Sequence, residues 1–339
     1  MIDFPVDIVY TWVDGSDKNW LKKKNEVLRK YSNFHKTDEI SGNERFFNRN
    51  ELKYSLRSVS KFAPWVGKIF IVTDNQIPDW LNLNHSKIEI VDHMEIFGNK
   101  GKLPCFNSSA IGSRLHHING LANNFLYLND DVFLGRDTTI ADFFSLPSKP
   151  KLFVGEKFKS FNKKILLEKK SMIRDNTYQR SILNTRKIIY KKFDKIIPYS
   201  LRHGIICYNK SQLYKLDELY NVEIENTLNN QFRDNSDIIF SSLNAFHLLA
   251  TGWQTPYYLK PYRKNYIQYK FNFIRKHRDY VFIPLNLTTD RIESKLKAIK
   301  NYSPLMFCIN DYPNTEIEKY DQVSKFLSHF YGDKSEFEK

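Results

Sequence analysis

Short apolar runs recur along the chain, and each has the length and residue types of a buried β-strand. Val, Ile, Phe and Tyr dominate these runs, and turn-forming residues follow most of them. Most of the runs lie in the first half of the chain, and one lies near its end. They cover residues 7–13, 67–74, 87–93, 123–130 and 305–311. The pattern predicts a strand at each of these places.

Two segments between these runs have the apolar spacing of helices instead. Residues 49–65 place four side chains on one helix face, namely Leu52, Leu56, Val59 and Ala63. Asn50 is positioned to cap this helix and Pro64 to end it. Residues 107–121 predict a second helix that Ser108 or Ser109 opens and whose core face holds Ile111, Leu115 and Ile118. Further on, a hairpin-like segment is predicted at 203–209, and helices around 211–220 and after 311.

The alternation of strands with helices predicts an α/β sheet, and such sheets bind ligands at the carboxyl ends of their strands. Acidic residues stand at those ends, namely Asp14, Asp74, Asp130 with Asp131, and Asp311. One such aspartate could simply cap the next element. Because the placement repeats, we expect these residues to mark a common site.

Asn129, Asp130 and Asp131 form the most acidic of these strand ends. Adjacent carboxylates disfavour full ionisation unless something neutralises them. Mg²⁺ and Mn²⁺ prefer hard oxygen ligands of this kind, together with substrate phosphates. In an extended segment Asn129 and Asp131 would project to the same side. The alternative is a solvated turn, because Asn and Asp are also common turn residues.

His203 and Arg233 are further candidates for chemistry. A histidine can act as a general base near neutral pH, and an arginine can hold a phosphate and stabilise developing charge. A lone histidine or arginine is more often structural. The pair therefore points to catalysis only if the fold brings both side chains to the acidic strand ends.

The charge of the chain favours anionic partners. The formal net charge is +14, and Lys and Arg are dense at residues 157–195 and 260–280. Such stretches form either a solvated helix face or a surface for a polyanion or lipid headgroups. No common RNA- or DNA-binding motif accompanies them, so we expect no nucleic acid partner.

Other features bear on compartment and chemistry. We expect Cys105, Cys207 and Cys308 to be buried reduced thiols. The absence of a long apolar run and of a signal-like start predicts a cytoplasmic protein without a transmembrane helix. P-loop, dinucleotide-binding and nucleophile-elbow motifs are missing from the sequence. His116 and His117 are adjacent, so we expect them to line a surface or cleft rather than hold zinc.

Four blocks of the sequence resemble the conserved regions of the Stealth family, in the family order. The first is IVYTWVDGSDKNW, and the second extends from RFFNRNELKYSLRSVSKFAPW to FNSSAIGSRLHHINGLANNFLYLNDDVFLG. RHGIICYNK with NTLNNQFRDNSDI resembles the third, and MFCINDY with KSEFEK resembles the fourth. These blocks together span almost the whole chain.

The resemblance implies a GT-A-like nucleotide-sugar-binding fold with a helical, basic insertion. Residues 1–150 would bind the nucleotide sugar and metal, 151–200 would form the insertion, and 201–339 would complete the same domain. The implied reaction transfers a sugar 1-phosphate from a UDP-sugar to a hydroxyl of a glycan acceptor in capsular or cell-wall polysaccharide synthesis. A phosphodiester forms, UMP leaves, and Mg²⁺ or Mn²⁺ assists. An oligosaccharide or lipid-linked acceptor could bring the protein to the inner face of the cell membrane.

The same resemblance assigns roles to individual residues. It implies nucleotide-sugar contacts for Trp12, Asp14, Asp74, Asn107 and Asn129. It implies metal ligation by Asp130, Asp131 and Asp311, and catalysis by His203, Arg233 and Asp131. One departure is that the family usually has His-x-Pro where this chain has His203-Gly204-Ile205. Two alternatives stay open: a GT-A glycosyltransferase that releases UDP, and a non-catalytic binder of polyanions.

Overall fold

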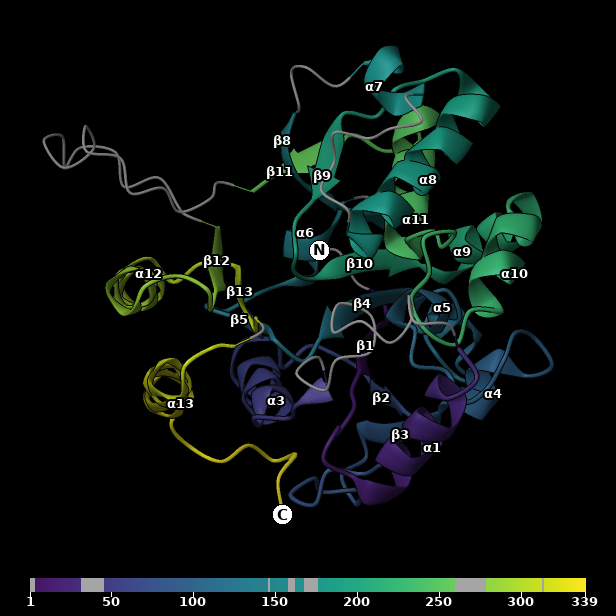
Figure 1. Ribbon diagram of the computed structural model, residues 1–339. Helices are drawn as coiled ribbons and strands as arrows, with labels where there is room; N and C mark the ends of the chain where they lie inside the picture. Colours follow the sequence, from purple (N-terminus) through teal and green to yellow (C-terminus); the bar gives the residue numbers. More distant parts are fainter. Residues whose placement is uncertain are drawn as a thin grey trace, which may run out of the picture.

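A five-stranded sheet in the order β10-β4-β1-β2-β3 forms the centre of the protein (Figure 1). The computed structural model describes residues 4–31, 46–145, 147–157, 162–167, 176–259, 279–312 and 314–339. The parallel strands are β1 Val6–Thr11, β2 Ile69–Thr73, β3 Ile88–Asp92 and β4 Asn124–Asn129. β10 Ile206–Asn209 pairs antiparallel with β4. The predicted α/β class and the four predicted strands of this sheet are confirmed.

Both faces of the central sheet are covered, which explains why its middle strands are apolar almost without a break. Ile8 and Tyr10 of β1 belong to one core cluster, whereas Val9 belongs to another. α3 Glu51–Phe62 lines the first cluster, with its predicted apolar face fully buried. Helices that line the second cluster are α4 His93–Phe97, α5 Ser108–Gly112, α9 Lys210–Leu219, α10 Asn221–Leu228 and α11 Phe240–Ala250.

Two details of the predicted helices are wrong. Asn50 adopts a left-handed conformation with φ 65°, and its side chain makes no capping hydrogen bond to α3. The helix predicted over 107–121 is instead α5 followed by a 3₁₀ turn, η3 Leu115–His117, and Asn107 rather than a serine caps α5. The Ser113 hydroxyl bonds back to Ala110 O at 2.7 Å, next to Gly112, and both features weaken helix continuation.

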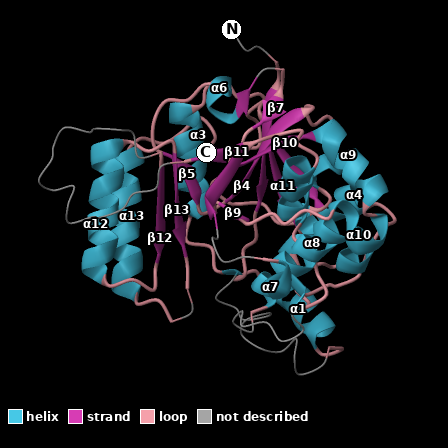
Figure 2. Ribbon diagram, turned by 90° about the horizontal axis from the view of Figure 1, so that it is seen from above, coloured by secondary structure: helices cyan, strands magenta, loops and turns pink. Residues whose placement is uncertain are grey.

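A second sheet contains β12 Tyr280–Pro284, β13 Met306–Asn310 and β5 Val132–Leu134. The predicted strand near the end of the chain is confirmed as β13, but it lies outside the central sheet. β5 follows β4 after a two-residue turn and pairs antiparallel with β13. α12 Thr289–Tyr302 and α13 Ile317–Tyr331 lie side by side next to this sheet (Figure 2).

The basic region after residue 150 contains strands as well as helices. β8 Leu152–Lys157, β9 Tyr199–Leu201 and β11 Pro256–Tyr258 form a third sheet, and β6 Phe144–Ser145 pairs with β7 Lys149–Pro150. Its helices are α7 Lys163–Leu167 and α8 Thr177–Phe193. The remaining helices are α1 Lys18–Leu28 and α6 Ile140–Phe143.

The basic stretch at 260–280 lies almost entirely outside the described residues. Among the described helices, none combines the length and apolar character needed to cross a membrane.

Glu338 ties the closing segment to α3. It forms a bidentate ion pair with Arg57, with both N–O distances at 2.8 Å, and lies 3.5 Å from Lys53 Nζ. Burial alone would raise the pKa of Glu338, but hydrogen bonds from Arg57 and Ser335 lower it from 4.5 to about 2. The carboxylate therefore stabilises the fold above its unfolded pKa, and this contribution is lost as the pH falls toward the folded pKa.

We expect Glu338→Gln to lower the free energy of unfolding near neutral pH by about 2–3 kcal/mol, because it leaves Arg57 without its anion. Urea unfolding should show this difference shrinking as the pH falls below 4.5. The exposed Glu26→Gln serves as the matched control and should change stability by less than about 0.5 kcal/mol. A difference between wild type and Glu338→Gln that does not depend on pH would contradict the assignment.

Candidate active site

The acidic strand ends gather where the chain passes from the central sheet to the second sheet. β1, β2 and β4 run parallel, so Asp14, Asp74 and the Asp130–Asp131 turn follow strands that end at the same edge. The turn at Asp130–Asp131 is the connection from β4 to β5. The carboxyl ends of parallel strands are the edge at which α/β proteins bind ligands.

Asp131 interacts with three polar side chains at this edge. Its Oδ2 accepts hydrogen bonds from Asn310 Nδ2 at 3.0 Å and from Cys308 Sγ at 3.3 Å, and it lies 3.6 Å from His203 Nε2. Burial alone would raise the pKa of Asp131, but His203, Asn310 and Cys308 hold it below its usual range. Asp131 Oδ1 is buried and has no hydrogen-bond partner among the described residues. The carboxylate is thus ionised, with one oxygen left for a ligand.

Two further carboxyl groups lie close to Asp131. Burial, together with the charges of Glu51 and Asp131, raises the pKa of Asp130 well above its usual range. Burial also raises the pKa of Glu51, at the start of α3, to about 7. Both upward shifts reflect burial and, after it, the negative charge of neighbouring carboxylates. A bound cation would offset that negative charge.

His203 stands at the open side of this group. It follows β9, its backbone oxygen accepts a hydrogen bond from Tyr280 at 2.7 Å, and its ring packs against Phe282. The side chain is 42% exposed, whereas that of Asp131 is only 14% exposed. Burial alone would lower the pKa of His203, but the ion pair with Asp131 raises it above 6.5. The imidazole is therefore held by a carboxylate on one side and remains accessible to a substrate.

Arg233 reaches the same region from the loop after α10. Its guanidinium donates a hydrogen bond to Ser108 Oγ at 2.7 Å. Its positive charge acts to lower the pKa values of both His203 and Tyr127. The structure thus brings His203 next to Asp131 and places Arg233 near enough to His203 to act on its pKa.

Asn107 holds the loop that carries Arg233. Its side chain is fully buried, and its Nδ2 contacts Asp237 Oδ2 at 2.8 Å, Asn230 O at 3.1 Å and Phe232 O at 3.3 Å. Its Oδ1 accepts from Ser109 N. The sequence predicts a nucleotide-sugar contact for Asn107, but the protein itself occupies these polar atoms. We therefore assign Asn107 the role of positioning Arg233.

The other predicted nucleotide-sugar residues lie along the same edge. The Asp14 backbone exchanges hydrogen bonds with the Gln76 side chain at 2.9 and 3.0 Å, which fixes the loop after β1. Asp74 pairs with Lys23 Nζ at 3.0 Å, and Asn129 Oδ1 accepts from Tyr127 at 2.9 Å. Trp12 Nε1 and Asp74 Oδ2 are both buried without a hydrogen-bond partner among the described residues. These two atoms are the best placed to gain from a bound ligand.

Asp311 does not have the position expected of a metal ligand. Its Oδ2 forms an ion pair with Arg49 Nη1 at 2.8 Å, and its Oδ1 accepts from Tyr320 and from Tyr312 N. Arg49 also stacks on the Tyr320 ring, 3.6 Å from its centroid. The reason is topological: Asp311 follows β13 of the second sheet, and its neighbour Asn310 contacts Asp131 instead. We therefore leave Asp311 out of the proposed metal ligands.

Sequence reasoning missed the contributions of Glu51 and Cys308. Glu51 occupies the first turn of a helix, where an acid usually only complements the helix dipole. Cys308 is a buried thiol, as predicted, but it donates a hydrogen bond to Asp131. The only available signal was that Glu51 and Cys308 lie within blocks that resemble family regions.

The charge of the carboxyl groups favours a cation, but Asp130, Asp131 and Glu51 together are not among the groups of described residues whose ligand atoms lie within 4.8 Å of one another. Asp131 Oδ1 is a buried oxygen without a hydrogen-bond partner in the described part of the chain, and burial disfavours the anionic forms of Asp130 and Glu51. Mg²⁺ and Mn²⁺ prefer such oxygen ligands. Asp131, His203 and Cys308 do place one ligand atom each within 4.8 Å of one another. A thiol and an imidazole suit softer metals, whereas carboxylate oxygens suit magnesium or manganese.

Comparison with known proteins identifies the family. Residues 4–32 match the model of Stealth protein conserved region 1, and residues 45–152 match that of conserved region 2. A galactosyltransferase structure, LgtC with donor and acceptor sugar analogs, aligns over 95% of both chains with 12% identity and a TM-score of 0.40. A likeness that low carries no argument about this chain.

Relatives named as polysaccharide phosphotransferases match nearly the whole chain. The capsular polysaccharide phosphotransferase LcbA of Aeromonas hydrophila is 32% identical over 98% of this chain and 86% of its own length. Its namesake in Neisseria meningitidis is 32% identical over 96% and 82%. An exopolysaccharide phosphotransferase of Streptomyces coelicolor is 33% identical, and the chain spans 53% of that relative's length. On these matches, the chain belongs to the Stealth protein family.

Proposed function

We propose that the protein transfers a sugar 1-phosphate from a UDP-sugar to a hydroxyl group of a glycan acceptor, with release of UMP. The observation that carries the proposal is the pairing of His203 with Asp131 beside Asp130 and Glu51. It combines an accessible base with a carboxylate group suited to a diphosphate-bound cation. The names of the polysaccharide phosphotransferase relatives support the same reaction class.

The proposed metal ligands are Asp131, Asp130 and Glu51. Bound Mg²⁺ or Mn²⁺ would neutralise charge on the donor diphosphate and on the leaving UMP. Trp12, Asp14, Asp74 and Asn129 would contact the nucleotide sugar from the ends of the neighbouring strands. The buried, unpartnered Asp74 Oδ2 and Trp12 Nε1 support this placement.

His203 would take the proton from the acceptor hydroxyl through Nδ1, because its Nε2 faces Asp131. The hydroxyl oxygen then attacks the phosphorus that carries the sugar, and the bond from that phosphorus to the oxygen bridging it to UMP breaks. Arg233 would stabilise the negative charge on the transferring phosphoryl group. Because the bond between the sugar carbon and its oxygen is never broken, the anomeric configuration of the donor is kept in the product.

A panel of UDP-sugars tests the proposal, with Mg²⁺ or Mn²⁺ present and with or without an oligosaccharide acceptor. We expect metal-dependent release of UMP that increases with acceptor, and no release after chelation. Release of UDP would instead identify a glycosyltransferase that attacks the anomeric carbon. If no UDP-sugar is consumed under any of these conditions, the protein is a binder rather than an enzyme of this class.

The basic region would hold the acceptor. A sugar-phosphate chain carries one negative charge per linkage, and a lipid-linked acceptor would place the reaction at the cytoplasmic face of the membrane. Lys157, Lys164 and Lys191 are exposed in this region. Their charges are therefore free to attract an anionic glycan.

We expect the combined change of Lys157, Lys164 and Lys191 to glutamine to raise the KM for acceptor about tenfold and to leave the KM for UDP-sugar unchanged. The control carries the same charge change at Lys22, Lys300 and Lys334, which are exposed elsewhere. Because the attraction is electrostatic, added salt should reduce the difference between the variants. Equal effects of the two triple variants, or equal loss for donor and acceptor, would contradict the placement.

A further inference from the structure

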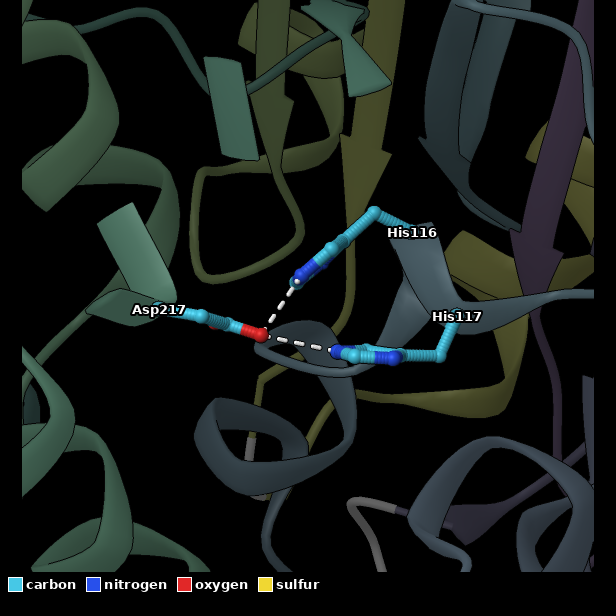
Figure 3. A group of neighbouring side chains, drawn as sticks. All are labelled: His116, His117 and Asp217. Carbon is cyan, nitrogen blue, oxygen red and sulfur yellow. Dashed lines mark hydrogen bonds and ion pairs between the residues drawn. The ribbon is translucent and has the colours of Figure 1, made fainter. Parts of the chain in front are cut away.

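A second group of ligand-type side chains lies between η3 and α9. His116 and His117 come from η3, and Asp217 comes from α9, about a hundred residues later in the chain. The two imidazole rings point toward one carboxylate oxygen of Asp217 (Figure 3). His116 Nε2 is 2.9 Å and His117 Nε2 is 2.8 Å from Asp217 Oδ2. None of these residues belongs to the proposed active site.

Some polar atoms of this group have several interaction partners, whereas others have none among the described residues. Asp217 Oδ2 is approached by both histidines and, at 3.5 Å, by Arg114 Nη1. Asp217 Oδ1 and His116 Nδ1 are buried without a hydrogen-bond partner among the described residues. An unpartnered buried carboxylate oxygen is costly unless something satisfies it. The hydrogen bonds of the group therefore leave Asp217 Oδ1 available to a further ligand.

The surroundings hold the two imidazole rings in fixed orientations. The His116 side chain is fully buried. Its ring is stacked on Phe240 with 5.6 Å between centroids. Tyr214 packs edge-on against both histidine rings. Imidazole rings held in fixed orientations are suited to binding a transition metal through a ring nitrogen.

We propose that His116, His117 and Asp217 bind a divalent transition metal of the zinc class. The three ligand atoms already lie within 4.8 Å of one another. Two imidazole nitrogens and a carboxylate oxygen form a typical protein ligand set for Zn²⁺, and a water molecule would complete four-coordination. Mg²⁺ and Ca²⁺ prefer all-oxygen sets, so the active-site cation would not compete here.

A bound metal would link η3 to α9. It would require the 3.5 Å contact between Arg114 and Asp217 to lengthen, because the guanidinium and the metal both carry positive charge. Arg114 keeps a second anchor, the hydrogen bond from its Nε to Ile96 O at 3.0 Å. The competing arrangement is a pair of hydrogen bonds from the two Nε2–H groups to Asp217. The experiment must separate the two.

Zinc titration of the full chain tests the proposal after chelator treatment, with excess Mg²⁺ present. We expect calorimetry to show a tight site that His117→Ala weakens by more than about 100-fold, since even the loss of a residue beside a metal ligand costs about 10–100-fold. His117 is 24% exposed, so this variant is expected to fold. Zinc should also raise the unfolding temperature of the wild type and not that of His117→Ala.

Two controls assign the metal to this group. The exposed His329→Ala should bind zinc like the wild type. Asp131, His203 and Cys308 form the other candidate group in the described residues, so His203→Ala should keep the tight site. Co²⁺ bound between His116, His117 and Asp217 should give ligand-field absorption without a sulfur charge-transfer band. Zinc binding that His117→Ala leaves intact, or no rise in unfolding temperature with zinc, would overturn the proposal in favour of the hydrogen-bonded arrangement.

Discussion

Replacing Asp131 by asparagine is expected to lower sugar-phosphate transfer by at least about 10³-fold. The substitution keeps the shape of the side chain but removes the negative charge on which His203, Asn310 and Cys308 converge. It also removes the carboxylate whose Oδ1 has no hydrogen-bond partner among the described residues. Loss of a metal ligand withdraws several kcal/mol of charge stabilisation in the transition state, and each 1.36 kcal/mol is about tenfold in rate. Initial rates of product formation at saturating donor and varied Mn²⁺ would measure the effect.

Asp311→Asn is the comparison variant for this prediction. Because Asp311 pairs with Arg49, its loss should reduce activity by less than about tenfold and leave the metal dependence unchanged. Calorimetric titration of Mn²⁺ provides a readout besides activity, and weaker binding is expected for Asp131→Asn only. The exposed Asp333→Asn controls for the chemical change itself. If Asp311→Asn loses metal binding and Asp131→Asn keeps it, the ligand assignment is reversed.

The sequence alone predicted the elements that depend on local residue patterns. The strand that delivers Asn129, Asp130 and Asp131 follows from an unbroken apolar run, and the apolar face of α3 follows from its spacing. The rule that ligands bind at carboxyl ends of parallel strands correctly grouped Asp14, Asp74 and Asp131 at one edge. These predictions needed no knowledge of which distant segments meet.

Predictions that depended on long-range pairing could not be made in the same way. The apolar run of β13 looks like any central strand, and only its pairing with β5 and β12 shows that Asp311 ends a different sheet. Glu51 reaches the acidic group because Ser55 and Ser58 of α3 bond to the backbone of β5. Nothing near Glu51 in the sequence encodes that contact. The same holds for Asp217, whose histidine partners lie about a hundred residues earlier.

The helix predicted after Asn107 is interrupted, because a nearby side chain bonds to its backbone. The apolar spacing of residues 107–121 fits a helix, and Ile111, Leu115 and Ile118 do pack against the core cluster as predicted. The backbone leaves the helix because Ser113 bonds to Ala110 O. The resulting 3₁₀ turn places His116 and His117 so that both rings approach Asp217. Side-chain burial was predictable here, but backbone geometry was not.

The second large effect is expected from His203→Ala. If His203 accepts the proton of the acceptor hydroxyl through Nδ1, its loss should lower kcat by about 10²–10⁴-fold and leave the KM for UDP-sugar unchanged. The wild-type rate should fall at acidic pH as the base becomes protonated, and the variant should lack that limb. The exposed His329→Ala should retain the wild-type profile.

A purely structural role for His203 predicts a different pattern. His203 is 42% exposed and its ring contacts Phe282, so its removal should change the unfolding free energy by only about 1 kcal/mol. Added imidazole can enter the space that the side chain leaves and accept the proton in its place. Partial recovery of the His203→Ala rate by imidazole, with no recovery for Asp131→Asn, would separate proton transfer from metal binding. A variant that keeps wild-type turnover would assign the base to another residue and leave Asp131 as the centre of the site.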